Sequence, residues 1–175
     1  MSKKKILTKA QNVRVAKNFI TSYGKARFRD FLTSLENGVS GQTIATGFGV
    51  SRERVRQWKN SYGITLNVYY PTQLTLDALA GGVTFVDGLD MKKGSKAQKN
   101  AKRVTKNFVK KKGVNVFARF INDIGKVDDE GKFISGEKIG NKYGMSRERV
   151  RQLRKIFGKS TSTYIVHTYI NALRK

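Results

Sequence analysis

Seven consecutive residues, six of them with strong hydrogen-bonding side chains, occur twice in this chain without a change, as Ser51–Gln57 and as Ser146–Gln152. Both copies have the sequence Ser-Arg-Glu-Arg-Val-Arg-Gln. Arg can donate two hydrogen bonds to guanine, Gln can donate one hydrogen bond to adenine and accept one from it, and Glu can accept a hydrogen bond from cytosine. Side chains of these types, presented on one face of a helix, have the chemistry to recognise base edges.

The helical period separates the residues that follow each Ser into two faces. At 100° per residue one face is apolar and is predicted to pack on a core, with Val55, Trp58 and Tyr62 in the first copy and Val150, Leu153 and Phe157 in the second. The other face is predicted to contact bases, because it is polar throughout. The predicted base-contacting residues are Arg52, Glu53, Arg56, Gln57 and Asn60, and in the second copy Arg147, Glu148, Arg151, Gln152 and Lys155.

A short helix and a tight turn are predicted just before each of these segments. The short helices span 41–48 and 136–143, and a Gly at 49 or 144 supplies the turn. Ser51 and Ser146 are expected to cap the following helices, whose N-termini can hold a phosphate group. The pattern is that of a helix-turn-helix unit. Predicted phosphate contacts in the two units are Ser51, Arg54, Ser146 and Arg149.

The segments Phe48–Gln57 and Tyr143–Gln152 resemble region 4 of bacterial sigma factors. In that family the pattern recognises the −35 promoter element in the major groove. The resemblance implies base-contact roles for Arg52, Glu53, Arg56 and Gln57, and for Arg147, Glu148, Arg151 and Gln152. It agrees with the helical faces derived above. The chain has no recognisable promoter-melting domain, so a complete sigma factor is disfavoured.

The duplication extends well beyond these segments. Arg14–Phe19 corresponds to Arg103–Phe108, and Phe28 and Phe31 correspond to Phe117 and Phe120. The expected fold is mainly all-α, with two tandem helix-turn-helix domains at 8–79 and 95–175 and a Gly/Lys-rich linker at 80–94. A strand is predicted at 64–70 and a helix from Pro71 to Ala80. In the second copy the predicted helices are 96–112, 114–124, 136–143, 147–157 and 162–174.

The charge of the chain is strongly basic and uneven. The 175 residues include 36 Lys and Arg and 12 Asp and Glu, a net charge of +24. The tract from Lys92 to Lys112 has ten basic residues and no acidic residue. Such an excess favours a polyanionic partner, because neutralised phosphates release counterions. Predicted phosphate contacts in this tract are Lys99, Lys102, Arg103, Lys106 and Lys110.

Composition argues against an enzyme, a cofactor and a metal site. The chain has no Cys and a single His, His167, which is expected to be a packed or surface residue. The acidic run Asp128–Glu130 is interpreted as an exposed turn of a small hairpin within 125–135, not as a cation site. No stretch has the length of a membrane span. We expect no membrane partner and a cytoplasmic, nucleoid-associated location in a bacterial or phage-infected cell.

Two linked units suggest that the monomer acts as a pseudo-dimer on double-stranded DNA. A 15-residue linker reaches about 50 Å when extended. Successive major-groove segments are about 34–36 Å apart. The leading hypothesis is therefore a phage or bacterial transcriptional regulator that binds a bipartite site. RNA polymerase remains open as a further partner. The alternatives are an architectural or genome-packaging protein, and the DNA-recognition subunit of a terminase or recombinase system.

Overall fold

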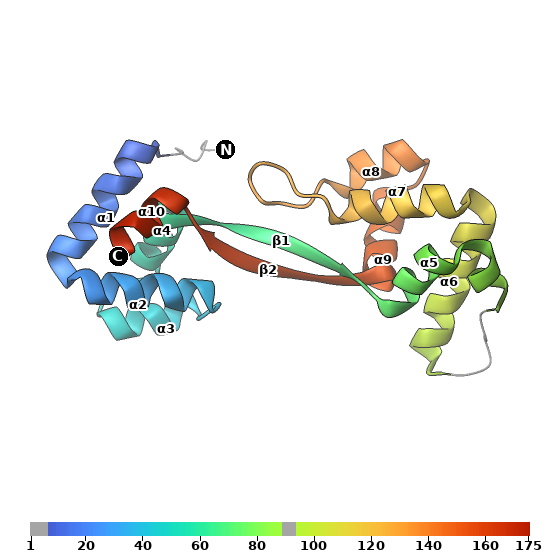
Figure 1. The fold of residues 1–175 in the computed structure, drawn as a ribbon, viewed down its shortest axis with the longest axis horizontal. Coiled ribbons are helices and arrows are strands. Elements are labelled where there is room, and N and C mark those ends of the chain that lie inside the picture. Colours follow the sequence, from blue (N-terminus) through green and yellow to red (C-terminus); the bar gives the residue numbers. More distant parts are fainter. Residues whose placement is uncertain (1–6, 89–93) are drawn as a thin grey trace. The chain divides into compact units, whose positions relative to one another are not determined.

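The computed structural model describes residues 7–88 and 94–175, and these are mainly helical, as predicted (Figure 1). The elements of the first half are α1 (Lys9–Tyr23), α2 (Lys25–Glu36), α3 (Gly41–Phe48), α4 (Arg52–Tyr62), β1 (Gly63–Pro71) and α5 (Gln73–Gly88). Those of the second half are α6 (Lys96–Lys112), α7 (Val114–Gly125), α8 (Gly136–Tyr143), α9 (Arg147–Phe157), β2 (Gly158–Val166) and α10 (Thr168–Arg174).

Four helices, a strand and a further helix thus follow one another twice, and matching helices begin in the same way. At the start of α1, the Thr8 hydroxyl and the Gln11 side chain form a capping box. Ser95 and Gln98 form the same arrangement at the start of α6. These reciprocal bonds satisfy backbone N–H groups that have no partner within the helix.

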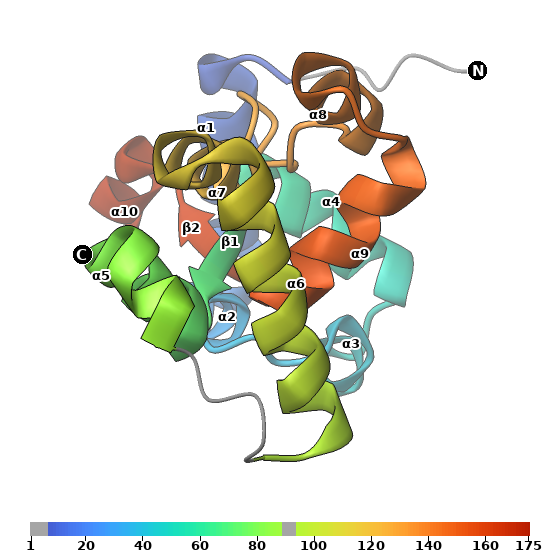
Figure 2. The same cartoon turned by 90° about the vertical axis from the view of Figure 1, so that its right-hand side faces the viewer.

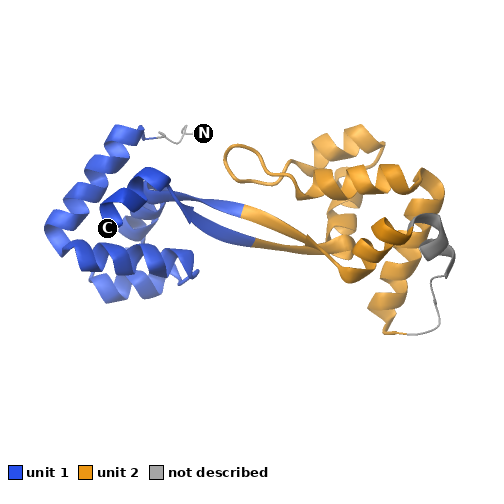
Figure 3. Ribbon diagram, viewed as in Figure 1, with its two compact units in different colours: residues 1–66, 162–175 blue, residues 67–161 orange. Residues whose placement is uncertain are grey.

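The chain folds into two compact units, which do not follow the boundaries of the sequence repeats (Figure 3). Unit 1 combines the chain up to Leu66 with Ser162–Lys175, and unit 2 is Asn67–Thr161. Residues 67–79, assigned by sequence to the first domain, therefore belong to unit 2. Residues 162–175, assigned to the second domain, belong to unit 1.

An aromatic cluster forms the core of unit 1. Phe19 from α1, Phe28 and Phe31 from α2 and Trp58 from α4 are almost completely buried, and the Phe19 and Trp58 ring centroids are 4.7 Å apart. Ile170 from α10 joins the same core with no exposed surface. The helical spacing predicted a core role for Trp58, and its burial confirms it.

Unit 2 has an equivalent aromatic core. Phe108 from α6, Phe117 and Phe120 from α7 and Phe157 from α9 pack with Ala78 from α5. The Phe117 and Phe157 rings meet edge to face at 5.1 Å. Helices α5, α7 and α9 all pack against α6, which runs down the middle of Figure 2.

The predicted linker at 80–94 is wrong for residues 80–88. These residues continue α5, which packs against α6 and α7. Glycines at 81 and 82 suggested a loop, but tertiary packing outweighs the weak preference of single glycines. Residues 89–93 of the predicted linker lie outside the described residues. The reach estimated from a 15-residue extended linker therefore does not apply.

Two further boundaries differ from the prediction near the strands. The strand expected at 64–70 is confirmed as β1, and the following helix begins at Gln73 rather than at Pro71. The predicted helix at 162–174 is wrong at its start, because residues 162–166 belong to β2. Strand β2 pairs with β1, a partner distant in sequence, and this pairing decides its conformation.

The insert of the second repeat forms the predicted small hairpin. Val127 and Phe133 form an antiparallel bridge. The Asp128 carboxylate accepts hydrogen bonds from the backbone N–H groups of Glu130 and Lys132 at 3.0 and 2.9 Å. The acidic run therefore stabilises a turn. No group of residues suited to a metal ion occurs in the parts of the chain that the structure describes.

Candidate nucleic-acid interface

Helices α3 and α4 are held together by a turn that needs glycine. Gly49 has φ +64°, a left-handed conformation that residues with a side chain rarely adopt. The Ser51 hydroxyl then accepts a hydrogen bond from the Arg54 backbone N–H at 3.2 Å and caps α4. Both predictions for this turn are confirmed.

Helices α8 and α9 of unit 2 repeat this arrangement closely. Gly144 also has φ +64°, and the Met145 backbone N–H donates to the Gly140 carbonyl at 2.9 Å. The Ser146 hydroxyl accepts from the Arg149 N–H at 3.2 Å. Both serine hydroxyls are thus engaged as caps, and the first turns of α4 and α9 are exposed to solvent.

The inner faces of α4 and α9 are buried as predicted. Val55, Trp58 and Tyr62 expose 1%, 3% and 0% of their surface. The inner face of α9 is equally buried and consists of Val150, Leu153 and Phe157. Because both helices are fixed along one side, their opposite faces have a defined orientation within each unit.

A hydrogen-bonded network covers the outer face of α4. The Glu53 carboxylate accepts from Nε and Nη2 of Arg56 at 2.6 and 2.5 Å, and from Nε2 of Gln57 at 3.5 Å. The Gln57 amide oxygen accepts from Nη1 of Arg54 at 3.3 Å. Arg54 also lies over the Trp58 ring, 5.2 Å from its centroid. Local bonds therefore connect four neighbouring polar side chains before any ligand binds.

The outer face of α9 has the same network. Glu148 accepts from Nε and Nη2 of Arg151 at 2.7 and 2.6 Å and from Gln152 at 3.2 Å. Gln152 in turn accepts from Nη1 of Arg149 at 3.4 Å. Two helices in separate units thus present the same side chains with the same bonds.

The Glu–Arg pairs leave one edge of each guanidinium available. Arg56 and Arg151 use Nε and one hydrogen of Nη2 for the carboxylate. Nη1 and the second hydrogen of Nη2 remain, and this edge has the geometry of a bidentate donor. The hydrogen bond from Arg56 lowers the pKa of Glu53, and that from Arg151 lowers the pKa of Glu148 to about 2. Both carboxylates are therefore ionised at neutral pH and hold their arginines in place.

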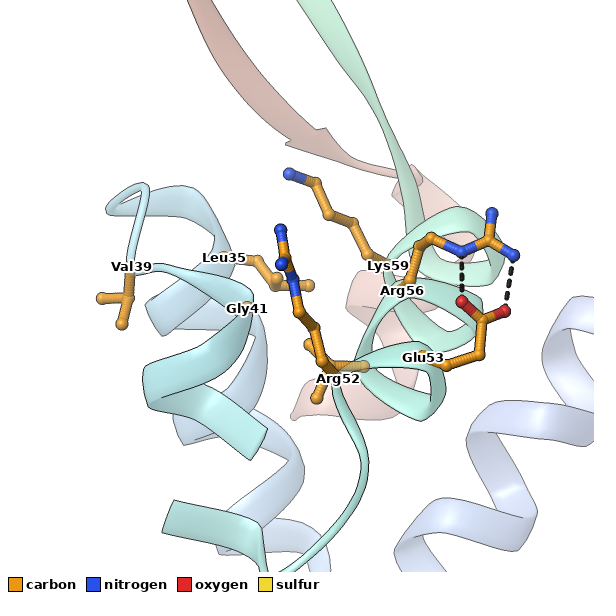
Figure 4. A pocket seen from close by; sticks show the side chains of 8 residues that line it. Leu35, Val39, Gly41, Arg52, Glu53, Arg56 and Lys59 are labelled. Atoms are coloured by element: carbon orange, nitrogen blue, oxygen red, sulfur yellow. Dashed lines mark hydrogen bonds and ion pairs between the residues drawn. The ribbon is translucent and has the colours of Figure 1, made fainter. Parts of the chain in front are cut away.

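A groove adjoins the outer face of α4 in unit 1 (Figure 4). It has a volume of about 520 Å³. The side chains of Arg52, Arg56 and Lys59 stand along α4, with Glu53 as the one acidic lining residue. The apolar side is formed by Leu35 and Val39 from α2 and the loop after it, with Gly41 and Val55 completing the lining. Three cations against one anion make this groove suited to an anionic ligand.

In unit 2 the insert hairpin contacts the residue equivalent to Lys59. Arg154 follows Val150 by four residues, as Lys59 follows Val55. Its Nη2 donates to the Ile134 carbonyl at 3.2 Å, and its guanidinium lies 5.0 Å from the centroid of the Phe133 ring. Burial lowers the pKa of Arg154. This arginine therefore has a structural role, whereas Lys59 lines a groove.

The predicted base-contacting residues are all exposed and lie together on one helix in each unit. In unit 1 these are Arg52, Glu53, Arg56, Gln57 and Asn60, and in unit 2 Arg147, Glu148, Arg151, Gln152 and Lys155. Sequence reasoning missed Lys59. Its position three residues after Arg56 was a usable signal, because residues three apart share a helix face.

The basic tract lies on a different helix, α6. One side of α6 is buried inside unit 2, through Thr105, Phe108 and Val109. Among the predicted phosphate contacts, Lys99, Arg103 and Lys110 are exposed, whereas Lys102 and Lys106 are partly buried. Lys110–Lys112 occupy the last turn, where positive charge also stabilises the helix dipole. Lys92 and Lys93, at the start of the predicted tract, lie outside the described residues.

Comparisons with protein-family models, curated proteins and solved structures found no match to this chain. Among the described residues, no helix is long and apolar enough to cross a membrane.

Proposed function

We propose that the protein is a sequence-specific double-stranded DNA-binding protein, with α3–α4 and α8–α9 as two helix-turn-helix units. The observation that carries this proposal is the identical network of Glu, Arg and Gln on the exposed faces of α4 and α9. If the outer faces of α4 and α9 only had to be soluble, nothing would require the same Glu, Arg and Gln hydrogen bonds on both helices.

The chemistry of this face suits the major groove. The free edge of Arg56, formed by Nη1 and Nη2, matches the O6 and N7 acceptors of guanine, and Arg151 offers the same edge. Glu53 and Glu148 fix these edges in advance, so less side-chain entropy is lost on binding. Phosphates on either side would meet the exposed first turns of α4 and α9 and the basic groove beside α4.

Because both helices carry the same residues, we propose that they recognise related half-sites of one bipartite site. The resemblance to sigma factor region 4 supports promoter-type DNA as the target. A phage or bacterial transcriptional regulator is the function that fits best, with contact to RNA polymerase as an additional proposal.

Architectural or packaging activity is the second candidate, and one observation favours it. The cations of α6 lie on a different helix from the network of α9, and α6 has no acidic residue. Such a surface binds phosphate without regard to sequence. A packaging protein, however, has no use for Glu53 and Glu148 on its DNA face.

Selection of binding sites from random duplex DNA at two salt concentrations tests the proposal. A regulator is expected to enrich two copies of a short motif and to prefer it over random DNA by about 10³-fold or more. Absence of an enriched motif, with a steep salt dependence of binding, would refute sequence-specific recognition and favour packaging.

A further inference from the structure

Each compact unit is completed by a strand and helix from the opposite repeat. We name Gly63–Gly88, which contains β1 and α5, arm 1, and Gly158–Arg174, which contains β2 and α10, arm 2. Helix α10 packs against α1 and α2 in unit 1, and α5 packs against α6 and α7 in unit 2. The helix of each arm therefore covers helices of the other repeat (Figures 1 and 3).

A tyrosine of each arm makes the same bond in its unit. The Tyr164 hydroxyl, from arm 2, donates to the backbone carbonyl of Lys59 at 2.8 Å. The Tyr69 hydroxyl, from arm 1, donates to the carbonyl of Arg154 at 2.9 Å. Lys59 and Arg154 occupy equivalent positions in α4 and α9, so the two contacts are reciprocal.

Backbone bonds at the end of each helix repeat this reciprocity. The His167 N–H donates to the Tyr62 carbonyl at 2.8 Å, and the Thr72 N–H donates to the Phe157 carbonyl at 2.8 Å. His167 and Thr72 precede the helices of their arms at matching positions. Two independent sets of contacts thus show the same exchange.

The arms pack so closely against Gly63 and Gly158 that no larger residue fits at these two positions. A Cβ atom at Gly63 would collide with the Ile165 carbonyl oxygen and the Tyr164 side chain, and one at Gly158 would collide with the Tyr69 side chain and the Tyr70 carbonyl oxygen. Both glycines are the first residues of the strands, directly after α4 and α9. The sequence of each repeat is therefore adapted to receive the arm of the other.

Helix α10 makes polar contacts that only unit 1 provides. Arg174 forms an ion pair with Glu36 at 3.0 Å, and Asn12 donates to the Tyr169 hydroxyl at 3.2 Å. By the alignment of the repeats, the residue of unit 2 at the position of Glu36 is Gly125, which has no side chain to form this ion pair with α10.

Helix α5 has its own requirement in unit 2. The Thr75 hydroxyl, without exposed surface, donates to the Phe157 carbonyl at 2.8 Å. The equivalent residue of α10 is Ile170, which is larger and has no hydroxyl. Placing α10 in unit 2 would therefore put Ile170 where Thr75 packs, which overfills that site and removes the buried hydrogen bond to the Phe157 carbonyl.

We propose that this protein is a single-chain form of an arm-exchanged dimer, in which each repeat binds the arm of the other and rejects its own. In the first repeat the interaction surface is formed by α1, α2 and the end of α4. In the second repeat it is formed by α6, α7 and the end of α9. Its partner is the arm of the opposite repeat. The proposal rests on the fold and does not depend on DNA binding.

Cutting the folded full-length protein between the repeats tests this proposal. A protease site inserted between Gly88 and Gly94 allows the cut, and native mass spectrometry then weighs the product. We expect one species that contains both halves and separates only in denaturant. Free halves, or species with two copies of the same half, would overturn the proposal.

A matched pair of substitutions locates each arm in the intact chain. Tyr164→Phe is expected to shift the backbone amide NMR signals around Lys59, and Tyr69→Phe those around Arg154, because each removes one hydrogen bond to that carbonyl. Each variant is the control for the other, and both keep the aromatic ring. Shifts confined to the repeat that carries the substitution would refute arm exchange.

Discussion

Replacing Arg56 and Arg151 together by Ala is expected to abolish most sequence preference while leaving general DNA binding. Each arginine presents one bidentate edge, held by its glutamate at 2.5–2.7 Å. A bidentate contact to a base contributes about 1–3 kcal/mol of discrimination. Two contacts then amount to about 2–6 kcal/mol, or a loss of preference between about 30-fold and about 10⁴-fold.

The matched control removes the same charge from the basic helix. Lys110→Ala with Lys111→Ala also lowers the net charge by two, but both lysines lie in the last turn of α6. Fluorescence anisotropy with the selected site and a scrambled duplex separates the effects. The lysine variant should weaken both affinities equally and reduce the salt slope by about 2. If both variants lose the same factor on both duplexes, the arginines do not recognise bases.

Three further outcomes follow from other side-chain contacts in the two units. Replacing Glu53 and Glu148 by Gln removes two negative charges, so affinity for scrambled DNA should rise. The same change releases Arg56 and Arg151 from the carboxylates that orient them, so sequence preference should fall in the same anisotropy assay. Burial raises the pKa of Asp123, but hydrogen bonds from lysine and tyrosine neighbours outweigh it and lower that pKa to about 2. The unfolded value is near 4, so this stabilisation is complete above about pH 4 and is lost as the pH falls towards 2. Asp123→Asn should therefore lower the free energy of unfolding at pH 7 by about 2 kcal/mol and flatten its acid dependence, as measured by denaturant titration. Ser51→Ala and Ser146→Ala should each lower the thermal unfolding midpoint, since a lost N-cap costs about 1 kcal/mol, and an unchanged midpoint would contradict the capping role.

Local sequence signals predicted most helices and the candidate interface. Ser51 and Ser146 marked the start of α4 and α9, and Gly49 and Gly144 marked the turns before them. The helical period placed Trp58 and its apolar neighbours inward and the charged residues outward. These features depend on residues a few positions apart, so a short window of sequence contains the information.

The structure of the arms depended on distant contacts, and there the predictions failed. The glycines within residues 80–88 predicted a linker, yet these residues continue a helix that packs on α6 and α7. Residues 162–166 were assigned to a helix, yet they pair with β1. Their conformation is decided by partners far away in the chain.

The groove shows the same division between local and tertiary information. Lys59 and Arg154 occupy equivalent positions in nearly identical helices, and the local sequence assigns them the same role. Only the tertiary structure places Phe133 and the Ile134 carbonyl against Arg154 and leaves Lys59 beside a groove. Which faces of α4 and α9 are polar can be read from the local sequence, because the polar face follows from a period of 3.6 residues. The tertiary structure alone decided which repeat each arm completes, because that choice depends on packing volume and hydrogen-bond partners that come together only in the folded chain.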